Sequence, residues 1–168
     1  KTFDISSDLY ELSKNKVFII CSGAKSILDL DKTYEKLESF GIPRIGYKTK
    51  FMPGFWYYQT NNKVDYNFKK ISELTNYLKT YEKFKHDISV LIFNAISKEK
   101  TIQKNKINKW IKVSLKKAKK LSIDGKELTP FLIKEINVLS KNKTLDTNIE
   151  LIIDNAKLAG KLANSFFS

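Results

Sequence analysis

The chain has 168 residues, of which 42% are hydrophobic and 12% aromatic, enough for one folded domain with a buried core. Its formal net charge is +13, but Arg44 is the only arginine among the 31 Lys and Arg residues. Because bidentate contacts to bases and phosphates favour Arg, this composition argues against dedicated nucleic-acid readout. No apolar run approaches the roughly 18 residues that span a bilayer. The single cysteine favours a reducing compartment, so we expect a cytoplasmic protein.

The first part of the sequence predicts a strand–helix–strand unit. A short helix over residues 7–12 precedes the apolar run 17–21, which has the length and β-branched content of a buried strand. Apolar residues keep helical spacing over residues 30–40, and Gly41 ends this helix. A second strand is expected over residues 44–49, and the short return between strands is typical of a parallel crossover unit.

The rest of the sequence predicts one more strand and several helices. The strand covers residues 88–94 and lies between amphipathic helices over residues 71–81 and 107–121. Thr129 followed by Pro130 predicts the start of another helix, and apolar spacing over residues 149–163 predicts the last one. We therefore expect a single α/β domain over the whole chain, layered α/β/α, with helices flanking a mixed, largely parallel central sheet.

The turn after the first strand carries the lysine most suited to chemistry. Lys25 follows Gly23 and Ala24 directly after the strand, and open α/β sheets bind their ligands at the carboxyl ends of strands. Partial desolvation there would favour the neutral amine, which is a nucleophile. The alternative is an ordinary solvated lysine on a loop.

Near the start of the chain, residues 4–8 combine two carboxylates with two hydroxyls. Asp4, Ser6, Ser7 and Asp8 suit a hard cation such as Mg²⁺ or Mn²⁺, or the polar oxygens of a sugar phosphate. The alternative is capping and dipole compensation at the start of a helix. A lone histidine and a lone cysteine cannot build a zinc site or a catalytic triad.

Two further segments leave alternatives open. The aromatic loop over residues 51–58 could line a pocket or fill the core. Residues 98–120 hold the densest run of lysines, which predicts a solvated helix face, with nonspecific polyanion binding at low salt as the alternative.

Five segments resemble a known family in sequence and in order. They are residues 2–9, 21–30, 40–47, 125–132 and 148–156, and together they resemble the carboxyl-terminal half of the pseudouridine-5′-phosphate glycosidases, also called the indigoidine synthase A-like family. The resemblance spans essentially the whole chain. The middle of the chain is more diverged, and the turn 94–97 departs from the family's usual Asn-Pro-rich turn.

The resemblance implies an activity and roles for six residues. The family reversibly cleaves the carbon–carbon glycosidic bond of pseudouridine 5′-phosphate, giving uracil and ribose 5-phosphate, through an imine on a lysine. By resemblance, this chain is therefore part of a hydrolase or lyase of nucleotide metabolism. The implied roles are Lys25 as the nucleophile, Asp4 as a ligand of a divalent metal, expected to be Mn²⁺, and Ser6, Ser7, Asp8 and Asn148 as substrate contacts.

The family's proton-donating glutamate and a second substrate lysine lie in an amino-terminal half that this chain does not contain. We therefore expect residues 1–168 to be inert alone and to need that half, which is a separate chain, a cleaved or disordered segment, or a part deleted from this sequence. The resemblance also implies a homotrimer. The alternatives are a noncatalytic basic module that binds RNA or another polyanion, and a degenerate structural subunit.

Overall fold

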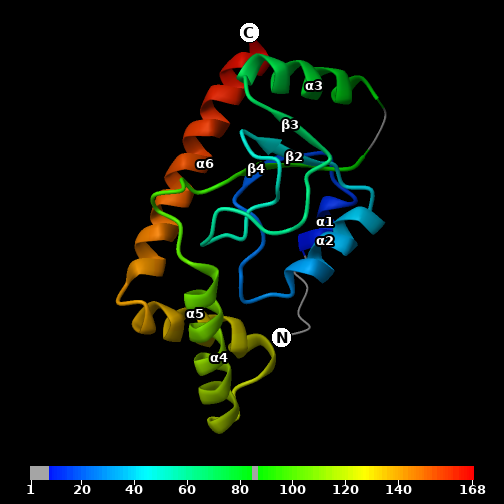
Figure 1. Cartoon of the computed structure of the whole chain (residues 1–168). Coiled ribbons are helices and arrows are strands. Elements are labelled where there is room, and N and C mark those ends of the chain that lie inside the picture. The colour runs from blue at the N-terminus through cyan, green and yellow to red at the C-terminus, as the bar shows by residue number, and fades with distance from the viewer. Residues whose placement is uncertain (1–7, 85–86) are drawn as a thin grey trace.

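A parallel four-stranded sheet lies at the centre of the computed structural model, which describes residues 8–84 and 87–168. Its strands follow the order β1-β4-β2-β3, and every pairing within the sheet is parallel (Figure 1). The predicted α/β class is thereby confirmed, and the one antiparallel contact among the described residues is an isolated bridge between Phe51 and Lys63. The strands are β1 (Phe18–Cys21), β2 (Arg44–Tyr47), β3 (Tyr66–Phe68) and β4 (Val90–Asn94).

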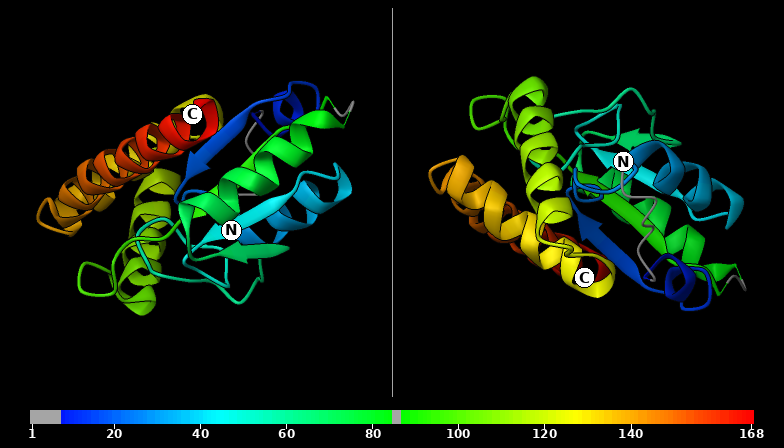
Figure 2. Two further views of the ribbon diagram at one scale, coloured as in Figure 1. Left: turned by 90° about the horizontal axis from the view of Figure 1, so that it is seen from above. Right: turned by 90° about the horizontal axis from the view of Figure 1, so that it is seen from below.

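Helices cover both faces of the sheet. The described residues form α1 (Asp8–Leu12), α2 (Leu30–Ser39), α3 (Ile71–Lys83), α4 (Lys104–Lys120), α5 (Gly125–Leu139) and α6 (Lys143–Phe167). The α1 and α2 helices pack on one face, and α3 and α6 pack on the other. Figures 1 and 2 show α6 running along the sheet, while α4 and α5 lie beyond one end of it. No helix in the described part of the chain combines the length and apolarity needed to cross a membrane.

The central strand β4 shows how the two cores form. Side chains alternate between the faces of a strand, so Val90 and Ile92 pack with α3 and α6, whereas Leu91 and Phe93 pack with α1 and α2. All four side chains are buried. Covered parallel strands read as continuous apolar runs for this reason, which is why the sequence predicts this strand well.

A third apolar cluster lies where α4 and α5 pack beside the aromatic loop. It joins Trp56 and Tyr57 of the loop to Ile107 of α4 and Leu132 of α5. Trp56 is 1% exposed and Tyr57 7%, so these two rings fill the core. Of the two alternatives for the loop, core filling therefore holds for Trp56 and Tyr57.

The start predicted for α5 is wrong. The helix begins at Gly125, and Pro130 lies inside it. A proline at this position forgoes one backbone hydrogen bond, but Leu128 packs against the apolar cluster of α4 and α5, which favours the extra turn. The last helix also begins earlier than predicted, at Lys143, because Thr144 and Thr147 are buried on its inner face.

Candidate functional site

Lys25 and Asp8 line one cavity of about 430 Å³. Lys25 lies in the turn after β1, and Asp8 is the first residue of α1. The cavity walls are otherwise mostly apolar and include Phe55 of the aromatic loop. The structure thus brings together two of the predicted site residues at the carboxyl end of a parallel strand, the usual ligand position of such sheets.

The Lys25 turn is held against the aromatic loop from both sides. Gly23 has a φ of +88°, and a Cβ atom there would lie 2.0 Å from the carbonyl oxygen of Pro53. On the other side of Lys25, the hydroxyl of Ser26 donates to the carbonyl oxygen of Gly54 at 2.5 Å. Glycine at position 23 therefore allows an approach that no other residue would permit.

Two further hydrogen bonds, one from a backbone amide and one from a tyrosine hydroxyl, hold the aromatic loop in place. The amide of Phe55 donates to the carbonyl oxygen of Ser22 at 3.0 Å. The hydroxyl of the buried Tyr34, on α2, donates to the carbonyl oxygen of Pro53 at 2.9 Å. The loop is thus fixed between β1 and α2, and it fixes the backbone on either side of Lys25 in turn.

The side chain of Lys25 is exposed in this chain, as is Asp8. The desolvation predicted for Lys25 from the sequence is therefore not supplied by the described residues. What they do supply is a fixed backbone and a cavity wall. Any exclusion of water from the amine has to come from a further covering element.

Asn148 lies on α6 and is engaged by the aromatic loop. Its side-chain oxygen accepts a hydrogen bond of 2.7 Å from the indole nitrogen of Trp56. Asn148 is half-buried and does not line the cavity that holds Lys25. The structure therefore gives it a contact that supports the loop, while its role toward substrate stays a prediction.

A second asparagine of α6 joins the carboxyl ends of two strands. The oxygen of Asn155 lies 3.2 Å from the hydroxyl of Ser22, which follows β1, and 3.1 Å from the side-chain nitrogen of Asn94, the last residue of β4. Sequence reasoning did not single out this cluster. Asn148 and Asn155 are seven residues apart and hence on one face of a helix, but this spacing does not reveal the contacts of Asn155 with Ser22 and Asn94.

Burial keeps the nucleophilic thiol near the site protonated. Cys21 lines the same cavity as Lys25, and desolvation raises the pKa of its thiol to about 11. Burial also raises the pKa of Tyr34 far above its ordinary value, and that of Tyr57 to about 12. At neutral pH the thiol and both phenols are uncharged, so among these groups none is an anionic nucleophile.

The described residues do not by themselves form a divalent-metal site. Asp8 is the only carboxylate that lines the cavity, and nowhere in residues 8–84 and 87–168 do three potential metal-binding His, Cys, Asp or Glu side chains come together. The predicted residues Asp4, Ser6 and Ser7 lie outside the described residues. The divalent-metal site thus stays a prediction.

The lysine-rich segment forms an outer helix face, as predicted. Ile107, Ser114 and Ala118 of α4 are buried, whereas the lysines of this helix are exposed. Lys117 pairs with Glu135 of α5 at 2.7 Å. Part of the positive charge is therefore balanced within the helical layer.

The fold and the site define an α/β protein with a candidate site at the carboxyl ends of its parallel strands, where a lysine on a fixed turn lines the same cavity as a carboxylate. A family model described as "Indigoidine synthase A like protein" matches residues 1–165. The chain belongs to this family, and the predicted resemblance is thereby confirmed.

Curated relatives are about two-fifths identical to the chain over the residues that align with it. The pseudouridine-5′-phosphate glycosidase of Brachyspira hyodysenteriae is 41% identical over 166 residues, which are 99% of this chain and 54% of the relative. The enzyme of the same name from Petrotoga mobilis is 42% identical over 166 residues, with the same coverage. The chain thus spans about half the length of these relatives.

Solved structures show the same fold. The prealnumycin C-glycosynthase AlnA, solved in complex with ribulose 5-phosphate, superposes with a TM-score of 0.90 at 25% identity, over 99% of this chain and 55% of that one. An indigoidine synthase A-like protein from Thermotoga maritima superposes with a TM-score of 0.86 at 30% identity, over 95% of this chain and 53% of that one. Both match the described fold over nearly its full extent.

Proposed function

We propose that this chain is the Lys25-bearing half of a pseudouridine-5′-phosphate glycosidase. The observation that carries the proposal is the placement of Lys25 and Asp8 on one cavity at the end of β1, in a chain that belongs to the family. The relatives' names supply the reaction, and the sugar phosphate in the AlnA structure agrees with the substrate class.

Lys25 performs the covalent step in this proposal. Its neutral amine bonds to the anomeric carbon as the ring oxygen leaves and takes a proton, which opens the ribose. The nitrogen lone pair then expels C5 of uracil, so the carbon–carbon bond breaks and an imine forms on Lys25. Uracil takes a proton at C5, and water hydrolyses the imine to release ribose 5-phosphate and the amine.

The fixed turn reduces how much of the Lys25 residue has to be ordered before it can react. A carbon leaving group departs poorly, so the reaction depends on a nucleophile held in line with the anomeric carbon. The contacts of Gly23 and Ser26 with residues 53 and 54 hold the backbone on both sides of Lys25. Only the lysine side chain then has to be ordered when substrate binds.

Other predicted residues bind and orient the substrate. Asp8 faces the same cavity as Lys25 and accepts hydrogen bonds from ribose hydroxyls, together with Ser6 and Ser7. Asn148 contacts the uracil or ribose end. We also propose that Asp4 gives one ligand to a divalent metal, expected to be Mn²⁺, whose remaining ligands come from outside the described residues.

The remaining parts of the site come from the half that this chain does not span. It supplies the acid that protonates uracil, a second substrate lysine, and the cover that removes water from Lys25. The assembled enzyme is a homotrimer in this proposal. Residues 1–168 alone bind sugar phosphate weakly and do not turn over.

Borohydride trapping tests the covalent step. A fused chain, in which the amino-terminal half of the Petrotoga mobilis relative precedes residues 1–168, is incubated with ribose 5-phosphate and reduced. We expect a stable adduct on Lys25, found by peptide mass mapping, and no adduct in the Lys25→Arg variant. Labelling of another lysine, or full turnover of pseudouridine 5′-phosphate by Lys25→Ala, contradicts the mechanism.

A further inference from the structure

The α6 helix carries a second apolar stripe that faces outward. Its members are spaced by steps of three and four residues over more than five turns, a length of about 30 Å. They are Leu145, Ile149, Ile152, Ala156, Ala159, Ala163 and Phe166. Apart from the half-buried Phe166, all are exposed, and Ile152 is 69% exposed. Such spacing is typical of a helix face that contacts another helix.

This outward stripe is separate from the face that packs on the sheet. The inner face of α6 buries Leu151, Leu158 and Leu162. At 100° a residue, the outward stripe is centred roughly 120° around the helix from these leucines. The polar face, with Lys157 and Lys161, occupies the remaining side. The helix therefore has two apolar faces, and only one of them is covered by the described residues.

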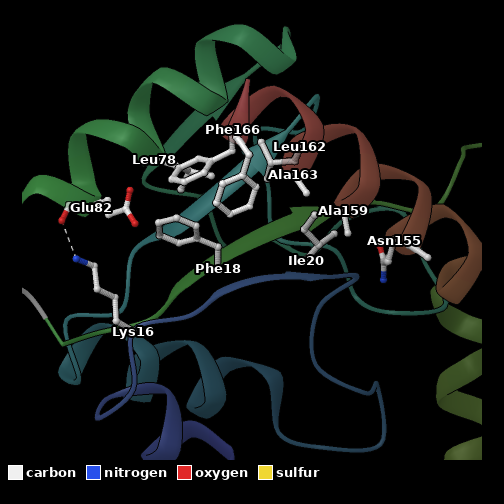
Figure 3. A pocket seen from close by; sticks show the side chains of 12 residues that line it. Lys16, Phe18, Ile20, Leu78, Glu82, Asn155, Ala159, Leu162, Ala163 and Phe166 are labelled. Atoms are coloured by element: carbon white, nitrogen blue, oxygen red, sulfur yellow. Dashed lines mark hydrogen bonds between the residues drawn. The ribbon is translucent and has the colours of Figure 1, made fainter.

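The alanines of the stripe form one wall of a groove of about 630 Å³. Phe18 and Ile20 of β1 form the opposite wall (Figure 3). Figure 3 shows Asn155 at one end of the groove and Lys16 beside Glu82 at the other. Because the side chain of Asn155 accepts a hydrogen bond from Ser22, the groove ends next to the turn that carries Lys25.

The strand that borders the groove lies at the edge of the sheet. β4 is the only strand beside β1 in the described part of the chain, so the other edge of β1 has no paired strand there. All four residues of β1 are half-buried. Parallel sheets are normally covered on both faces, and an open apolar edge strand pairs readily with another strand.

The shape of the groove favours a helix with large side chains over a second copy of this chain as the segment that fills it. Three alanines make the α6 wall concave, and a second copy of the same concave surface would leave the space between the two copies empty. A helix with large apolar side chains fills it. The relatives extend over nearly as much chain again as the part matched here.

We propose that a helix of the family's amino-terminal half packs into the groove between β1 and the alanines of α6, beside a strand that pairs with the open edge of β1. This inference rests on the proposed function for the identity of the missing half. It makes the groove the place where that half is held next to the Lys25 turn. The sheet then continues past β1, and the apolar stripe of α6 becomes part of a core.

Cysteine labelling tests the occupant without any substrate. Ala163→Cys and the adjacent Asn164→Cys are made in residues 1–168 alone and in the fused chain with the Petrotoga mobilis amino-terminal half. The unsubstituted chain, whose one cysteine is Cys21, gives the background. We expect maleimide to label Ala163→Cys at least tenfold more slowly in the fused chain than in residues 1–168. Asn164→Cys should react at the same rate in both.

Equal rates at position 163 in the two chains overturn the proposal. A second measurement uses charge: Ala159→Arg should lower the melting temperature of the fused chain but leave residues 1–168 unchanged, whereas Asn164→Arg changes neither. Protection of position 163 in a fused chain that forms no imine would contradict the proposed function alone. Turnover with an unprotected position 163 would contradict the docking alone.

Discussion

The indole nitrogen of Trp56 donates a hydrogen bond of 2.7 Å to the side-chain oxygen of Asn148, and this bond joins α6 to the loop that holds the Lys25 turn. Trp56 is fully buried, and the next residues toward the amino terminus, Phe55 and Gly54, contact the turn directly. A residue distant in sequence from Lys25 thus supports its backbone through one aromatic side chain.

Replacing Asn148 by alanine should destabilise the chain. The buried indole N–H then loses its acceptor, which costs about 1–3 kcal/mol in the free energy of unfolding, measured by urea denaturation. In a Trp56→Phe background the same replacement should cost much less, because no donor is left unpaired. Equal costs in the two backgrounds would show that the bond contributes nothing.

The conservative change Asn148→Asp separates support of the loop from contact with substrate. Aspartate keeps an oxygen acceptor for Trp56, so the unfolding midpoint in urea should stay close to that of the unsubstituted chain. If Asn148 also contacts substrate, KM for pseudouridine 5′-phosphate should rise at least tenfold in the fused chain. An unchanged KM would remove the substrate role and leave only the structural one.

Gly23→Ala should strongly destabilise the folded chain. The new Cβ would clash with the backbone oxygen of Pro53, and the alanine would have to adopt a φ of +88°. We therefore expect the free energy of unfolding to fall by more than about 2 kcal/mol. Gly41→Ala is the matched control, because its φ is +64° and its Cβ would have open space. It should cost about 1 kcal/mol. Equal losses in thermal unfolding would mean that the Pro53 contact relaxes freely.

The sequence identifies those elements whose local pattern and tertiary packing agree. Residues 90–93 of β4 form one apolar run because both faces of the strand are covered. The three-residue strand β3 has no such pattern, since Tyr66 and Asn67 are exposed at the edge of the sheet. At Thr129 a good local cap is overridden, because Leu128 gains contacts in the apolar cluster of α4 and α5.

In the site, too, some features can be predicted from local sequence and others depend on tertiary packing. Lys25 and Asp8 are recognisable from the residues around them, and the structure places them on one cavity. The link from Asn155 to Ser22 and Asn94 joins three elements that are far apart in sequence. It depends on how α6 crosses the sheet, and a single sequence carries no direct signal for that. The exposure of Lys25 likewise depends on what covers the turn.

Stability should fall at high pH through Cys21. Burial raises the pKa of its thiol from 9.0 to about 11, so the folded state holds this proton more tightly than the unfolded state. The stabilisation is complete below pH 9 and is lost as pH rises toward 11. Urea midpoints of Cys21→Ala should therefore fall less steeply over this range than those of the unsubstituted chain. Tyr34 and Tyr57 contribute equally to both, so parallel curves would contradict the assignment.

Lys25→Ala should separate function from stability. Because the side chain is exposed, the free energy of unfolding of residues 1–168 should change by less than about 0.5 kcal/mol. Turnover of pseudouridine 5′-phosphate by the fused chain should fall at least a thousandfold, since the covalent step is lost. A large loss of stability would instead place Lys25 in the structure of the turn.

The exposed lysines of α4 should be unimportant for catalysis. Lys116, Lys119 and Lys120 point away from the apolar clusters, so replacing all three by glutamine should leave kcat/KM of the fused chain within twofold. The same change should weaken binding to a short single-stranded RNA at low salt, because that binding depends on charge alone. A noncatalytic RNA-binding module makes the opposite prediction: tight binding at physiological salt, indifferent to Lys25→Ala and abolished by the triple change. Fluorescence anisotropy over a salt series decides between them, since the slope of affinity against salt measures how many phosphates the lysines neutralise.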